Sequence, residues 1–118
     1  MNKTKVTCEM EITLLAMGGK WKPLILYYLI ENGTKRFGEI MSYLNSASQK
    51  TLTKQLRELE TDGLITRKIY AEVPPKVEYS ITQKGSSLFP ILELMCEWGE
   101  KNITDKYEVI NPQCRDCR

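Results

Sequence analysis

The segment 46–82 constrains the fold more than any other part of the chain. Its first half, 49–61, has leucines at helical spacing, which predicts a helix with one buried face. Gly63 follows this helix as a stop signal. Two strand-like runs come next, 64–70 and 76–82, and the stretch between them contains a pair of prolines that cannot donate to a sheet. We therefore expect a helix followed directly by a β-hairpin.

The helix 49–61 has cations on the side opposite its leucines. Lys50, Lys54 and Arg57 cluster within about 60° of one another around the helix axis. A DNA major groove is about 12 Å wide and admits one α-helix, so a recognition helix needs an apolar back, small polar residues and flanking cations. The expected DNA contacts come from this helix and its cap and from the hairpin: Ser48, Gln49, Lys50, Thr51, Thr53, Lys54, Arg57, Arg67 and Lys76.

Each of these residues also has an ordinary structural interpretation. Charged faces are common on surface helices, and Gln49 and Thr51 are typical residues at a helix start. Cations on the hairpin, Lys68 among them, can also protect a sheet edge from aggregation. The order of the elements favours DNA binding for the helix and leaves both interpretations open for the hairpin.

The order of elements predicts the fold class. Helix, helix, short strand, helix, helix, strand, strand and helix is the order of an α+β, mainly helical winged helix-turn-helix. Its first helix, 9–18, and its last helical stretch, 82–107 with a kink or restart near Pro90, are the expected N- and C-terminal dimerisation helices. The expected dimer interface residues are apolar and at helical spacing: Leu88, Leu92, Met95 and Trp98.

Length and charge indicate a single domain. The chain has 118 residues, of which 8–105 are expected to form the ordered core and 106–118 a mobile tail. A net charge of +2 is too small to indicate nucleic acid by itself. No apolar run approaches the roughly 20 residues of a membrane span. We therefore expect a cytoplasmic protein with no membrane partner.

The composition argues against an enzyme. Histidine is absent, which excludes Ser-His-Asp and Cys-His catalysis and any metal site that contains histidine. The glycines follow no phosphate-binding pattern. We accordingly expect no catalytic residue, no metal site and no cofactor.

The motif series resembles one family of regulators. The segments "GGKWKPLILYYL", "RFGEI", "SQKTLTKQLRELETDGLITRKIY", "VPPKVEYSIT", "KGSSLFPIL" and "CEWG" are similar to those of the HxlR-type winged-helix transcriptional regulators, over roughly 8–99. The resemblance implies a bacterial homodimer with contacts through the first and last helices. It also implies recognition of a double-stranded DNA operator by the helix 49–61, and a dimer asks for a pseudo-palindromic operator.

The resemblance also gives Cys8 a candidate role. Several members of the family look like sensors of oxidants or reactive carbonyl compounds through a cysteine near the N-terminus, and Cys8 stands at that position. Glu9 follows it, whereas many relatives have proline there. A helix N-terminus favours a thiolate, so Cys8 is a candidate sensor for a small reactive effector. The alternative is an inert small residue at the dimer interface.

The other cysteines have simpler interpretations. Cys96 follows Met95 on the last helix and is expected to pack there. Cys114 and Cys117 form a single CxxC, which is half of a zinc site, and we expect a dispensable tail. Two tails meeting in a dimer would supply the four thiolates of a zinc site. Such a shared zinc site is the alternative to a dispensable tail.

Two other classes of function stay open at this point. One is a winged-helix module that binds proteins and has lost DNA binding. The other is a regulator of the MarR type that responds to a small molecule, although this chain has fewer and shorter helices. The basic face of 49–61 favours DNA binding over the first of these.

Overall fold

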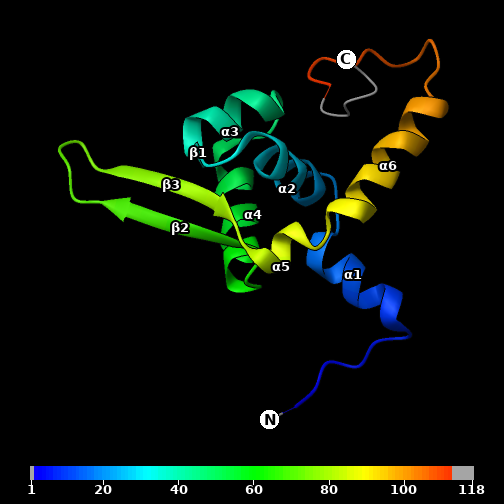
Figure 1. Cartoon of the computed structure of the whole chain (residues 1–118), viewed down its shortest axis with the longest axis horizontal. Coiled ribbons are helices and arrows are strands. Elements are labelled where there is room, and N and C mark those ends of the chain that lie inside the picture. Colours follow the sequence, from blue (N-terminus) through cyan, green and yellow to red (C-terminus); the bar gives the residue numbers. More distant parts are fainter. Residues whose placement is uncertain (1, 113–118) are drawn as a thin grey trace.

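The computed structural model describes residues 2–112. In chain order its elements are α1 (Glu9–Met17), α2 (Trp21–Asn32), β1 (Lys35–Arg36), α3 (Phe37–Leu44), α4 (Gln49–Thr61), β2 (Ile65–Tyr70), β3 (Lys76–Ile81), α5 (Gln83–Ser86) and α6 (Phe89–Lys101). The hairpin of β2 and β3 projects at one end of the molecule, and α1 and α6 lie at the other (Figure 1). The predicted element order of a winged helix-turn-helix is confirmed.

Helix α4 begins and ends where the sequence predicts. Its leucine stripe is buried against α2, and Leu52, Leu56 and Leu59 are each at most 2% exposed. Burying one such side chain contributes about 1.5–3 kcal/mol. After the helix, Gly63 adopts φ 75°, a left-handed conformation that glycine reaches without steric cost. Buried leucines on one side leave the opposite side of α4 facing outward.

The strands form a small antiparallel sheet in the order β1-β3-β2. Glu78 in the central strand pairs with Arg36 on one side and with Lys68 on the other. Because side chains alternate across a strand, these three residues share one face of the sheet, and Tyr79 lies on the other face, buried. The loop with Pro74 lies at the tip of the hairpin, outside both strands. The proline therefore does not interrupt the backbone hydrogen bonds between β2 and β3.

Helix α2 is buried over a wider arc than the sequence indicates. Ile25 and Leu29 are in the core, whereas Leu24, which has the same helical spacing in the sequence, is 38% exposed. Leu26 and Tyr27 are buried instead. The helix packs against α3, α4 and β3 on one side and α6 on another, so its buried face is not a single stripe.

The C-terminal helical stretch is divided, as predicted, near Pro90. The short α5 ends at Ser86 and α6 begins at Phe89, with the proline in its first turn, where a missing N–H costs little. The helix ends at Lys101 and not near residue 107 as expected, and the Asn102 side chain donates to the Trp98 carbonyl (2.8 Å). None of the helices within 2–112 has the length and apolar character that a membrane crossing needs.

Candidate nucleic-acid interface

The first turn of α4 is held by its own hydroxyl groups. The Thr51 N–H donates to Ser48 Oγ (3.0 Å), and this hydroxyl donates to Thr51 Oγ1 (2.9 Å). The Thr53 hydroxyl donates to the Gln49 carbonyl (2.8 Å). Three of the predicted DNA contacts, Ser48, Thr51 and Thr53, therefore take part in hydrogen bonds at the start of the helix. Ser48 is the cap, since its hydroxyl satisfies a backbone N–H group that the helix cannot.

The outward side of α4 is a continuous polar surface. Gln49, Lys50, Lys54 and Arg57 are exposed, and the last three are spaced by four and three residues, which puts them on one side of the helix. This surface borders a shallow hollow of about 760 Å³, lined by Gln49, Lys50, Thr53, Lys54, Arg57 and Glu58. We call these six residues the α4 stripe. Its cations lie opposite the leucines, as the sequence predicts, and they can approach a polyanion without disturbing the core.

Glu58 is the acid of the α4 stripe, and its ion-pair partner does not follow from the sequence. Lys22 in the first turn of α2 is 8% exposed, and its Nζ lies 2.7 Å from Glu58 Oε1. The hydrogen bond and charge of Lys22, with a smaller contribution from Lys54, hold the pKa of Glu58 below its ordinary value. The carboxylate therefore stays ionised and paired to the neighbouring helix.

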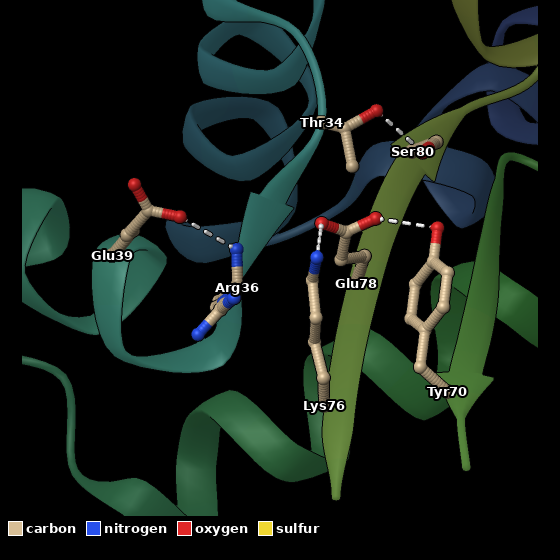
Figure 2. Close-up of polar contacts among 7 residues, drawn as sticks. All are labelled: Thr34, Arg36, Glu39, Tyr70, Lys76, Glu78 and Ser80. Carbon is tan, nitrogen blue, oxygen red and sulfur yellow. Dashed lines mark hydrogen bonds and ion pairs between the residues drawn. The ribbon is translucent and has the colours of Figure 1, made fainter. Parts of the chain in front are cut away.

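The hairpin has a second polar cluster, centred on Glu78 (Figure 2). The Tyr70 hydroxyl donates to Glu78 Oε1 (2.9 Å), and Lys76 Nζ lies 3.4 Å from Glu78 Oε2. The hydrogen bond from Tyr70, and then the one from Lys76, lower the pKa of Glu78. The ammonium groups of Lys68 and Lys76 each lie 4.8 Å from the centre of the Tyr70 ring. Lys76 is thus folded back along the sheet.

Arg67, the other predicted hairpin contact, lies between the sheet and α4. Its Nε is 3.6 Å from Glu60 Oε1, at the end of α4. Arg67 and Tyr79 are paired across the strands, so they share one face of the sheet. The arginine therefore links β2 to α4. For the guanidinium to reach DNA, its ion pair with Glu60 must break, or the guanidinium must contact Glu60 and the DNA together.

The remaining contacts in Figure 2 fix α3 and the sheet to each other. The Arg36 N–H donates to Glu39 Oε1 (2.9 Å), which caps the start of α3. The hydroxyls of Thr34, directly before β1, and of Ser80, in β3, are hydrogen-bonded at 2.7 Å. The first helix of the helix-turn-helix is thereby anchored to the hairpin.

Cys8 stands at the N-cap of α1 as a free, exposed thiol. Its carbonyl accepts from the Glu11 N–H (3.0 Å), and the Thr7 N–H donates to the Glu11 carboxylate (2.9 Å). The thiol is thus accessible at the start of the helix that the sequence analysis assigned to dimerisation. Cys96 is half-buried and packs against the core. Cys114 and Cys117 lie outside the described residues.

The four residues expected at a dimer interface differ in burial. Leu92 is only 3% exposed and belongs to the protomer's own core, and Leu88 is half-buried against it. Met95 is 49% exposed and Trp98 is 69% exposed. An outward apolar surface on α6 therefore consists of Met95 and Trp98 with their neighbours, and not of Leu92. Within residues 2–112, no three or more acidic or cysteine side chains are grouped to hold a metal ion.

These observations define a winged helix-turn-helix in which α4, the second helix of the helix-turn-helix, has a basic stripe. The model of the family described as HxlR-like helix-turn-helix matches residues 16–107. The chain is 53% identical over 100 residues to a protein named as the regulatory protein MalR of Fusobacterium mortiferum, covering 85% of this chain and 94% of that one. It is 46% identical over 114 residues to the HTH-type transcriptional regulator YkvN of Bacillus subtilis (strain 168), covering 92% and 96%.

A solved structure has a similar sequence and a similar fold. The redox regulator HypR in its oxidised form has a TM-score of 0.76 and 50% identity, over 82% of this chain and 99% of that one. The chain belongs to the HxlR-like helix-turn-helix family. This membership confirms the prediction of a DNA-binding transcriptional regulator, and confirms that the chain is not an enzyme.

Proposed function

We propose that the chain acts as a homodimer on a pseudo-palindromic operator and reads it with α4. The observation that carries this proposal is the α4 stripe, where exposed cations lie opposite a fully buried leucine face. Gln49 has an amide that can pair with adenine, and Lys50, Lys54 and Arg57 can bind guanine edges or phosphates. The proposed place of action is the cytoplasm, because the DNA target lies there.

The hairpin supplies backbone contacts in this proposal. Lys68 and Lys76 stack on Tyr70 on the outer face of the sheet, where they form a compact positive surface around Glu78. Phosphate contacts of this kind add affinity more than sequence preference. Replacing Lys76 by alanine should therefore weaken binding to specific and random DNA by similar factors.

The dimer surface in this proposal is built from α1 and α6. Four large apolar residues of α1 are more than half exposed: Met10, Ile12, Leu14 and Leu15. On α6, Leu94, Met95 and Trp98 are also exposed, and the last two line an apolar hollow of about 1120 Å³ beside α2. Apolar exposure of this extent is unusual for a monomer, and a two-fold axis here would leave both copies of α4 available.

Cys8 is the proposed switch of this regulator. It is exposed at the start of α1, so a change at its sulfur can move that helix against the partner subunit. The solved relatives include HypR in oxidised and reduced forms and YodB of Bacillus subtilis after diamide treatment. With diamide, two thiols lose two electrons and two protons to the reagent and form one disulfide, which joins Cys8 to the partner subunit's Cys8 or to a small thiol.

Selection of genomic DNA fragments by the wild-type chain tests the operator proposal. We expect enriched sites with two inverted half-sites whose centres lie about 10–10.5 bp, or a multiple of that spacing, apart. Sedimentation at micromolar concentration should show a dimer. A monomer that selects a single half-site would refute the homodimer and keep the role of α4.

A comparison of two variants tests the switch. Cys8→Ser and a chain truncated before Cys114 are treated with diamide or methylglyoxal, and operator binding is measured before and after. We expect the response to vanish in Cys8→Ser and to persist in the truncated chain. The opposite pattern would place the switch in the tail.

A further inference from the structure

Lys22 is a buried lysine whose charged end meets the recognition helix. It lies in the first turn of α2, is 8% exposed, and its Nζ is 2.7 Å from Glu58 Oε1 on α4. Replacing both members of a buried ion pair by well-packed apolar residues is often neutral or stabilising. The pair is therefore a weak argument for stability alone, and its geometry suggests a different role.

The ion pair is directional, unlike the apolar packing around it. Ile25 and Leu29 share the core cluster with the leucines of α4, and the hydrophobic effect that holds them is non-directional, so it fixes the rotation of α4 about its own axis less sharply than a hydrogen bond does. A rotation of about 20° moves a side-chain end at a radius of about 6 Å by about 2 Å. A shift of that size breaks a hydrogen bond to a base edge. A short charge-assisted hydrogen bond from Lys22 to Glu58 opposes such a rotation.

The pair also removes an unfavourable charge from the α4 stripe. Glu58 lines the same shallow hollow as Lys54 and Arg57. An uncompensated carboxylate at this place would repel phosphate, whereas the paired one is neutralised by Lys22. The lysine itself is buried under the helix and contributes charge without contacting DNA directly.

We propose that Lys22 is a positioning residue for DNA recognition, which sets the rotation of α4 through Glu58. This inference rests on the proposed function, because it assumes that the α4 stripe faces the major groove. The consequence is a division of labour: the exposed residues of α4 contact the DNA, and the Lys22–Glu58 pair holds those that read base edges at the correct rotation. Loss of the pair should therefore reduce the preference more than the affinity.

The test measures a preference ratio for full-length variants. The probes are a fluorescent 30-bp duplex of random sequence and a duplex selected from genomic fragments by the wild-type chain. The variants are Lys22→Met, Glu58→Met and the double variant. Each single change should lower the ratio of the two affinities about tenfold. The double change should lower it no further than either single one, because both remove the same contact.

A matched lysine provides the control. Lys20 is exposed and lies over the Trp21 ring at 4.5 Å, two residues before Lys22. Lys20→Met removes the same charge and leaves the Lys22–Glu58 pair in place, so its preference ratio should equal that of the wild type. A purely structural pair would lower the melting temperature of Lys22→Met and leave the ratio of the folded protein unchanged. If Lys22→Met does not fold, the half-exposed Glu58→Met decides the question alone.

The outcomes separate this inference from the function on which it rests. An unchanged ratio in both single variants, or additive losses in the double variant, would overturn the role of Lys22. Lys54→Ala serves as the reference for the stripe. If Lys54→Ala weakens both duplexes while Lys22→Met leaves the ratio intact, the positioning role fails and the proposed function stands. If Lys54→Ala weakens neither duplex, the assignment of α4 itself is wrong.

Discussion

Removing the cations of α4 should change the salt dependence of DNA binding by a calculable amount. The variant replaces Lys50, Lys54 and Arg57, all exposed, by alanine. Each phosphate neutralised contributes about −0.9 to the slope of log affinity against log salt concentration. Three cations per subunit and two subunits give a change in slope of about 5 if every cation contacts a phosphate. Between 50 and 200 mM salt, the wild type should therefore lose about three orders of magnitude more affinity than the variant.

The assay is fluorescence anisotropy with random-sequence and selected duplexes over this salt range. The control replaces Lys5, Lys101 and Lys106, which are exposed and lie outside α4. Both triple variants have net charge −1 per chain, since three positive charges are removed from +2. If both triple variants lose the same amount of slope, the change is due to net charge and not to the position of the cations on α4. A triple variant of α4 with the wild-type slope would refute the interface.

Three further changes probe the parts that support this interface. Ser48→Ala removes the N-cap of α4 and should lower the free energy of unfolding by about 1 kcal/mol in urea titrations; no loss would mean that the cap is dispensable. Gly85→Ala adds a Cβ where α5 meets backbone and should cost about 1–3 kcal/mol, whereas Gly38→Ala, with open space around it, should not destabilise. Glu78 has a lowered pKa, so its stabilising effect, due first to Tyr70, is present above the ordinary value of 4.5 and is lost as pH falls below it. Glu78→Gln should accordingly flatten the decrease in melting temperature below pH 4.5, and an unchanged pH profile would contradict this.

The sequence predicts the parts of the fold that depend on local signals. The bounds of α4 match the expectation because a capping serine directly precedes the leucine period and a glycine follows two residues after its end. The break before α6 follows in the same way from Pro90. The partner of Lys76 was also within reach: Glu78 is two residues along the same strand, hence on the same face, and this spacing favours an ion pair.

The unpredicted features depend on contacts between distant segments. Lys22 follows a tryptophan in a lysine-rich stretch and looks like a solvated residue, and only the packing of α2 on α4 brings it to Glu58. The apolar periodicity of α6 likewise does not distinguish residues buried in the core of the chain from residues on its outer surface. Leu92 faces the core and Trp98 faces solvent in the protomer, although both belong to one stripe in the sequence.

Thermodynamic linkage turns the proposed switch at Cys8 into a reciprocal prediction. If oxidation weakens operator binding by a given factor, operator DNA must disfavour oxidation of Cys8 by the same factor. Coupling of this kind is typically about 5–150-fold, and for a two-electron couple each factor of ten corresponds to about 30 mV. A titration in glutathione redox buffers, with and without saturating selected duplex, should therefore shift the midpoint potential of Cys8 by about 20–65 mV. Random duplex should shift it less, because its weaker contacts depend less on the spacing of the two copies of α4. An operator affinity that depends on oxidation, together with a midpoint potential that DNA leaves unchanged, would violate this linkage. The response would then arise from another thiol or from irreversible damage.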